Sequence, residues 1–170
     1  MVAVSSVDGR ITKWDEDYIY KWTSRQDYGY FENLKKDYDL IVMGSGTYNV
    51  VLPKPEKERL RIVLTKTPSK YKKLWISKQL EFSREAPLEL IKRLEKLGYK
   101  KMLLVGGSKI NTLFLKKKLV NQLWLTLEPK IFGEGKSMAN DKLNLSLKLN
   151  SIERLNANGT LLLKYLIDNR

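Results

Sequence analysis

Hydrophobic and polar residues follow one another along the chain in two patterns, one typical of buried strands and one typical of amphipathic helices. Short apolar runs that end at a glycine, lysine or proline alternate with segments whose apolar residues lie three and four positions apart. The alternation predicts an α/β domain with a mostly parallel sheet. The strand-like segments are 1–6, 40–43, 61–65, 102–105 and 122–128, and the helix-like segments are 24–38, 87–97 and 108–117.

The end of the chain has a different pattern. Apolar and polar residues alternate over 144–149, and Asn158-Gly159 precedes the apolar run 161–167. Because Asn-Gly is a hairpin turn signal, we expect an antiparallel hairpin at one edge of the sheet. No repeat or linker divides the sequence, so we expect a single domain over residues 1–170.

Composition narrows the chemistry. The 170 residues include no cysteine and no histidine, which excludes a Ser-His-Asp triad, a thiolate nucleophile and a cysteine- or histidine-bound metal. Acid–base chemistry must therefore come from Asp, Glu, Lys, Tyr, water or a cofactor, and we expect no metal. No apolar run is long enough to span a membrane, and Asp8 and Arg10 follow the apolar start too soon for a signal peptide. We expect a cytoplasmic protein with no membrane contact.

The charge of the chain has two interpretations. There are 32 Lys+Arg against 19 Asp+Glu, a net charge of +13. Such an excess is found in nucleic-acid-binding domains and in proteins with polyanionic small ligands. No RNA- or DNA-binding motif is present, so a basic nucleic-acid-binding domain without enzymatic activity is the less favoured alternative.

Two segments have the order strand, glycine, helix. They are Met43–Tyr48, with Gly44 and Gly46, and Val105–Ser108, with Gly106 and Gly107. At such junctions backbone N–H groups and a partly positive helix end can hold phosphate. Neither segment is a P-loop or a complete G-x-G-x-x-G. Together they favour a nucleotide ligand, and Lys66, after the strand 61–65, could meet one of its phosphates.

One acidic residue stands out. Asp27 precedes Phe31, Leu34 and Tyr38 by four, seven and eleven residues, which places it on the apolar face of its helix. A carboxylate there faces the core or a pocket and needs a partner. The alternative is that Asp27 belongs to a capping box with Ser24.

In these features the chain resembles the dihydrofolate reductase superfamily, which includes the reductase domain of riboflavin biosynthesis. Ser5–Ile11 is similar to the first strand and mobile loop of that family. Met43–Tyr48 is similar to its cofactor motif and Val105–Ser108 to its Gly-Gly turn. Pro129, Phe132, Gly133 and Gly135 look more like the riboflavin-type reductases.

The resemblance implies a three-layer fold, with a central, mostly parallel sheet of about eight strands, an antiparallel C-terminal hairpin and flanking helices. It implies NADPH as cofactor and a cis peptide between Gly106 and Gly107. A lysine beside the adenosine 2′-phosphate would favour NADPH over NADH. The residues implied to bind the cofactor are Ala3, Ile11, Thr12, Gly44, Ser45, Gly46, Thr47, Thr65, Lys66, Val105, Gly106, Gly107, Ser108, Lys109 and Ile110.

The resemblance also implies a substrate site. Asp27 would be the catalytic carboxylate and Thr126 would orient it. Arg59 falls where folate reductases hold a substrate carboxylate, and Arg61 is the alternative. The residues implied to bind substrate are Val4, Trp22, Asp27, Phe31, Val51, Arg59 and Thr126.

Two reductase activities are weighed for a small-molecule substrate, and reduction of another pterin or related heterocycle is a third possibility. The favoured one is NADPH-dependent reduction of dihydrofolate to tetrahydrofolate, in which the cofactor supplies the hydride and one carboxylate suffices. The alternative is the riboflavin-pathway reduction of a ribosylaminopyrimidine phosphate. Either a monomer or a homodimer is compatible with the family.

Overall fold

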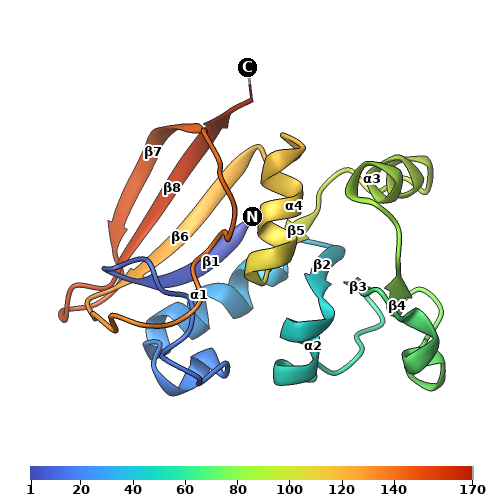
Figure 1. Ribbon diagram of the computed structural model, residues 1–170, viewed down its shortest axis with the longest axis horizontal. Helices are drawn as coiled ribbons and strands as arrows, with labels where there is room; N and C mark the ends of the chain where they lie inside the picture. The colour runs from blue at the N-terminus through green and yellow to red at the C-terminus, as the bar shows by residue number, and fades with distance from the viewer. Residues whose placement is uncertain (170) are drawn as a thin grey trace.

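The computed structural model describes residues 1–169 and contains two four-stranded sheets (Figure 1). In spatial order, the first consists of β1 (Val2–Ser6), β6 (Gln122–Glu128), β8 (Leu161–Asp168) and β7 (Ser146–Arg154). The second consists of β4 (Leu80–Ser83), β3 (Leu60–Leu64), β2 (Leu40–Gly44) and β5 (Leu103–Leu104).

The expectation of one eight-stranded sheet is therefore wrong. Strand β5 is only two residues long, and the backbone that follows it stays with β2. Val105 N–H donates to Val42 O, and Gly44 N–H donates to Gly106 O. No backbone hydrogen bond among residues 1–169 joins β5 to β1. Val2 of β1 and Leu103 of β5 instead belong to one cluster of buried side chains.

The strand directions agree with the sequence patterns. The sheet of β2 to β5 is parallel throughout, and β1 pairs in parallel with β6. Strands β7 and β8 form the expected antiparallel hairpin around Asn158-Gly159. Strand β4 was not predicted, because its four residues are too few to display a period.

Four α-helices connect or flank the strands. The N-terminus of α1 is capped by Ser24, whose Oγ accepts a hydrogen bond of 3.2 Å from Asp27 N–H, and α3 begins at a proline. The helices are α1 (Arg25–Lys35), α2 (Ser45–Val51), α3 (Pro87–Lys96) and α4 (Ser108–Lys116), with short 3-10 helices η1 (Ile19–Lys21) and η2 (Pro68–Leu74).

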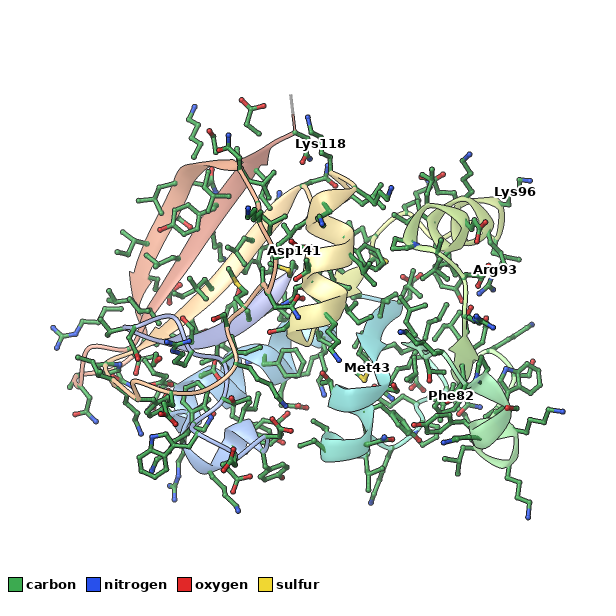
Figure 2. All side chains as sticks on the ribbon, in the orientation of Figure 1. Met43, Phe82, Arg93, Lys96, Lys118 and Asp141 are labelled. Atoms are coloured by element: carbon green, nitrogen blue, oxygen red, sulfur yellow. The ribbon has the colours of Figure 1, made fainter. Side chains whose placement is uncertain are left out.

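The parallel sheet is buried on both faces, which accounts for its unbroken apolar runs. Val42 and Ile62 belong to a core cluster with Leu90 of α3 and Phe114 of α4. Their neighbours along β2 and β3 point the other way, so Met43 lies in a second cluster that includes residues of α1 and α2. Met43 and Phe82 lie inside the fold in Figure 2, whereas Lys96 and Lys118 lie at its surface. The parallel sheet is thus the middle of three layers.

No helix within residues 1–169 is long and apolar enough to cross a membrane.

Candidate active site

A large cavity separates the two sheets. Its volume is about 1470 Å³, above the range of roughly 300–1,000 Å³ usual for a drug-sized ligand. Strands β1 and β2 and helices α1, α2 and α4 all contribute to its walls. A cavity of this size can hold a dinucleotide and a second molecule together.

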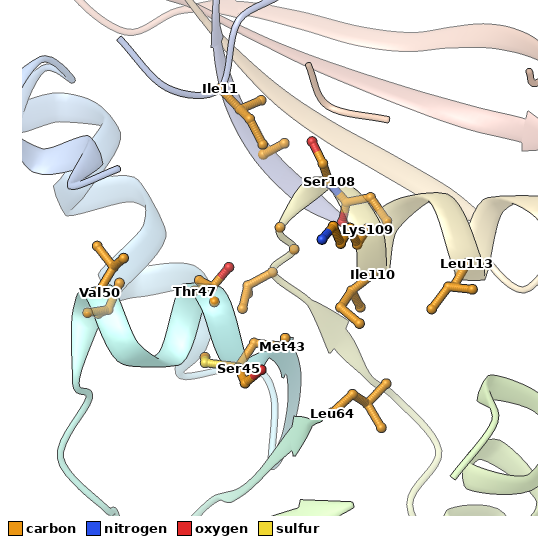
Figure 3. Close-up of a pocket in the computed structure, with 18 of the residues that line it drawn as sticks. Ile11, Met43, Ser45, Thr47, Val50, Leu64, Ser108, Lys109, Ile110 and Leu113 are labelled. Atoms are coloured by element: carbon orange, nitrogen blue, oxygen red, sulfur yellow. The ribbon is translucent and has the colours of Figure 1, made fainter. Parts of the chain in front are cut away.

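The two glycine turns meet at the centre of the cavity. Gly44 N–H donates to Gly106 O over 2.8 Å, and the peptide bond between Gly106 and Gly107 is cis, as expected. A Cβ atom on Gly107 would lie 3.2 Å from Thr47 Oγ1. Thr47 on α2 and Ser108 at the start of α4 therefore stand on either side of one space (Figure 3).

Cationic side chains line the end of the cavity next to β3 and β4. Lys66 follows β3 and Arg84 follows β4, and Lys109 lies in the first turn of α4. None of the three forms an ion pair with another residue between 1 and 169. This end can therefore offer positive charge to an anionic ligand.

An irregular segment around residues 137–140, whose sequence shows no periodic hydrophobic pattern, forms another wall of the cavity. Ser137 and Asn140 lie in it and line the cavity, and it is tied to α4 because Ser108 Oγ donates to Ser137 O and Asn111 Nδ2 donates to Met138 O. Asn111 Oδ1 is buried and has no partner among the described residues. Ser137 and Asn140 were not predicted from the sequence, since an irregular loop has no periodic pattern that would mark them.

The opposite end of the cavity holds Asp27, whose side chain is nearly buried. The pKa of Asp27 is raised to about 6, chiefly because the carboxyl is buried and to a smaller extent because the Glu128 carboxylate lies nearby. The hydroxyls of Thr126 and Thr23 oppose this rise. The carboxyl can therefore change its protonation state near neutral pH.

Glu128 is a second buried carboxylate that the sequence analysis did not single out. Its Oε1 accepts a 2.7 Å hydrogen bond from Ser24 N–H, and its Oε2 accepts a 2.9 Å hydrogen bond from the Thr160 hydroxyl. These bonds join α1, β6 and the β7–β8 hairpin beside Asp27. The signal was present, because a spacing of two places Thr126 and Glu128 on one face of β6.

Two cations border the Asp27 end. Lys35 of α1 lines the cavity and pairs with Glu32 over 2.7 Å. Arg61 is 2% exposed and also lines the cavity. It donates to Lys54 O and pairs with Glu56 over 3.4 Å, while its Nε is buried without a partner among residues 1–169. Burial lowers the pKa of Arg61 from its ordinary high value.

Most of the residues implied by the resemblance line this cavity. At the Asp27 end they include Val4, Phe31 and Val51, and the cofactor residues named from the sequence all lie in its wall. The resemblance did not point to Lys35 or Arg84, which also line the cavity. Lys109 was expected to bind the cofactor at the glycine turn, and it lines the cavity as well.

Three expected substrate residues do not line the cavity. Trp22 is buried and packs edge-on against Phe132, with ring centroids 5.1 Å apart. Thr126 is buried in β6, and its Oγ1 has no hydrogen bond of regular geometry among residues 1–169, although the hydroxyl is near enough to lower the pKa of Asp27. Trp22 and Thr126 are therefore buried beside the cavity and do not form its surface.

Arg59 is the third. Its guanidinium donates to Tyr38 O and Lys35 O and pairs with Glu56. It therefore caps the C-terminal end of α1 and is directed away from the cavity. Arg61, the alternative named from the sequence, lies two residues further along the chain inside β3 and lines the cavity.

The fold and the joined glycine turns place the chain in the dihydrofolate reductase-like superfamily. Within it, the chain belongs to the family of the RibD C-terminal domain, whose model matches residues 1–161. A comparison with curated protein sequences finds no match.

Solved structures agree on the fold. A protein of Shewanella sp. PV-4 described as a riboflavin biosynthesis protein superimposes with a TM-score of 0.78 at 21% identity, over 98% of this chain and 97% of that one. A pyrimidine reductase-like protein of Corynebacterium diphtheriae gives a TM-score of 0.79 at 17% identity, over 98% and 90%.

A two-activity enzyme gives the same result over part of its length. The diaminohydroxyphosphoribosylaminopyrimidine deaminase/5-amino-6-(5-phosphoribosylamino)uracil reductase of Thermotoga maritima has a TM-score of 0.77 at 17% identity. The match covers 97% of this chain and 55% of the Thermotoga chain, so this chain spans about half of that enzyme.

Family membership changes the order of the two activities. The matched family is the riboflavin-type one, which supports the alternative from the sequence analysis. Nothing in the comparisons supports dihydrofolate reduction, and nothing in them indicates nucleic-acid binding.

Proposed function

We propose that this chain is an NADPH-dependent reductase that acts on a ribosylaminopyrimidine phosphate. The observation that carries the proposal is the single cavity, which joins two glycine turns suited to phosphates with a buried carboxyl suited to a heterocycle. The family of the RibD C-terminal domain supports the same reaction class.

The residues present fit NADPH. The Thr47 hydroxyl and the backbone N–H groups at Gly107 and Ser108 offer donors for the pyrophosphate. Lys66 and Arg84, which form no ion pair within residues 1–169, provide positive charge for a 2′-phosphate. Asn111 Oδ1, which has no hydrogen-bond partner in the described part of the chain, is an acceptor in the same wall. When bound, NADPH would supply the hydride.

The chain itself would position the substrate and supply a proton. A neutral Asp27 carboxyl can donate a proton, and an ionised one can accept hydrogen bonds from N–H groups of a pyrimidine. We assign Thr126 to the orientation of Asp27. Because Glu128 fixes the start of α1, it also holds the backbone that carries Asp27.

We assign the phosphate of the substrate to Lys35 and Arg61. Both line the Asp27 end of the cavity, and the buried Arg61 Nε has no partner among residues 1–169. A phosphate is a strong acceptor for such a donor. The apolar side chains of Phe31, Val4 and Val51 would exclude water from the ring.

The test is to follow NADPH oxidation by the purified chain with 5-amino-6-(5-phosphoribosylamino)uracil and, separately, with dihydrofolate. We expect turnover with the first compound and none above background with the second. Asp27→Asn should lower kcat at least about tenfold and leave the affinity for NADPH unchanged, whereas Asp39→Asn, on the surface, should change neither. Turnover with dihydrofolate alone would overturn the proposal.

A further inference from the structure

A run of exposed apolar residues begins at the end of η2. Leu74, Trp75 and Ile76 are consecutive in the chain and are 46%, 54% and 40% exposed. None of them lines the cavity. Single exposed apolar residues are ordinary on a protein surface, but a contiguous group that includes a tryptophan is typical of a contact surface. The proposed reaction does not account for this group.

Four exposed lysines flank the apolar residues in the sequence: Lys70, Lys72, Lys73 and Lys78. None of the four forms an ion pair with another residue between 1 and 169. No aspartate or glutamate occurs from residue 60 to residue 80, and Glu81 and Glu85, which follow, both pair with Arg93. The lysines therefore place positive charge beside the apolar residues, and no ion pair of the described chain neutralises it.

The segment is held in a fixed shape by its neighbours. The ring of Tyr71 stacks on Phe82 of β4, with centroids 4.4 Å apart, and its hydroxyl is hydrogen-bonded to the Asn49 amide over 3.1 Å. Ile76 and Leu80 exchange two backbone hydrogen bonds of 2.9 Å, which close a tight turn. Because the segment is already ordered, a partner that binds it pays little for its immobilisation. In Figure 1 it is the green turn of helix beside β4, at the outer edge of the molecule.

The mixture of side chains favours a lipid surface over other anionic partners. Aliphatic side chains next to an exposed tryptophan can enter the boundary between headgroups and acyl chains, while lysines stay at the charged headgroups. A nucleic acid offers few partners to the aliphatic Leu74 and Ile76, and sites for single strands usually combine several aromatic side chains or arginines. Residues 68–80 contain one exposed aromatic side chain, Trp75, and no arginine.

We propose that residues 70–78 are a docking surface for a membrane that carries anionic lipids, with Leu74, Trp75 and Ile76 inserted at the level of the headgroups and the four lysines against the headgroup charges. Such binding is peripheral and reversible. The sequence expectation of no membrane contact rested on the lack of a spanning or signal segment, which does not bear on surface binding. The inference is independent of the proposed reaction.

Co-sedimentation of the purified chain with lipid vesicles tests the role of charge. We expect binding to phosphatidylcholine vesicles that contain about one third phosphatidylserine, release at about 0.5 M salt, and no binding to phosphatidylcholine alone. Lys70→Gln/Lys72→Gln/Lys73→Gln should weaken binding about a hundredfold.

The matched control is Lys96→Gln/Lys100→Gln/Lys101→Gln. It removes the same charge from exposed positions at and beyond the end of α3 and should bind as the wild type does. Absence of binding to the phosphatidylserine vesicles, equal binding to both kinds of vesicle, or equal losses in the two triple variants would overturn the proposal.

Tryptophan fluorescence tests the insertion. Brominated lipids in the anionic vesicles should quench the wild type, and Trp75→Ala should abolish the quenching and weaken binding at least about tenfold. Leu97→Ala, at a 62% exposed position at the end of α3, should change neither, and circular dichroism should show both variants folded. Quenching that persists in Trp75→Ala would overturn the proposal. So would a chain that retards a single-stranded oligonucleotide in a gel but does not bind anionic vesicles, since the surface would then belong to a nucleic acid.

Discussion

At the scale of single residues, the most informative group is the Asp27 carboxyl. Its helix position could be predicted from the spacing to Phe31 and Leu34, and the structure places it both at the N-terminal cap and in the cavity wall. The capping box is formed only in part: Asp27 N–H donates to Ser24 Oγ, but Ser24 N–H donates to Glu128 Oε1 and not to Asp27. The side chain of Asp27 faces the cavity.

Asp27 should make folding stability depend on pH. Because burial raises its pKa from 3.8 to about 6, its stabilising contribution is complete below pH 3.8 and is lost as the pH rises through about 6. The difference corresponds to at most about 3 kcal/mol. Asp27→Asn removes this titration, so the variant should gain stability relative to wild type as the pH increases.

Urea unfolding of both proteins from about pH 4 to about pH 8, at one protein concentration, measures this difference. Asp39→Asn is the matched control on the surface and should follow the wild type. Parallel curves for wild type and Asp27→Asn would show that the carboxyl titrates as it does in the unfolded chain.

Other residue assignments depended on information that the sequence lacks. Arg59 and Arg61 are two positions apart, and one faces the cavity while the other caps α1. Arg61 lies inside β3 and Arg59 immediately before it. The alternation of side chains along a strand therefore applies to Arg61 but does not say where the side chain of Arg59 points. Glu128 could have been recognised as buried because it ends an apolar strand, but its partners Ser24 and Thr160 are distant in sequence.

At the scale of elements, residues 132–136, which follow β6 and are called the strap below, pack against the N-terminal segment of the chain. Asp8 accepts hydrogen bonds from the N–H groups of Phe132 and Gly133, and Thr12 Oγ1 accepts one from Lys136 N–H. Gly135 lies between these contacts with φ +133°. The strap thereby fixes Thr12, which lines the cavity.

Two glycines of the strap should respond differently to alanine. A methyl group at Gly135 would overlap the carbonyl oxygen of Thr12, so Gly135→Ala should cost about 3 kcal/mol or more in unfolding free energy. Gly133 has φ +72° and open space around it, so Gly133→Ala should cost only about 1 kcal/mol. Chemical denaturation measures both, and equal losses would contradict the packing described for Thr12.

Long elements could be predicted well and short ones poorly. Helices α1, α3 and α4 and strands β2, β3, β6 and β8 have enough residues to show their periods. Strand β5 lies within the expected segment 102–105 but is shorter, and α2 follows the glycine turn after which a helix was expected. Strand β4 is set by pairing with β3, which a local pattern does not report. The length of β5 also decides whether there is one sheet or two.

At the scale of the whole molecule, the cavity brings the two sheets to one site. Residues of β1 from the first sheet and of β2 and β3 from the second line it, together with residues of α4. The net charge of +13 supports the capture of anions there, and the cations Lys66, Arg84 and Lys109 bring part of that charge to the cavity wall. The absence of histidine and cysteine is consistent with chemistry carried by a cofactor.

We propose that a hydride passes from NADPH to the substrate inside this cavity. The most direct measurement is mass spectrometry of the product formed with NADPH that carries deuterium at the transferable nicotinamide position, with 5-amino-6-(5-phosphoribosylamino)uracil as substrate. We predict one deuterium atom in each reduced product molecule. Product that carries no deuterium from the cofactor, or cofactor that stays unoxidised in the presence of this substrate, would contradict the account.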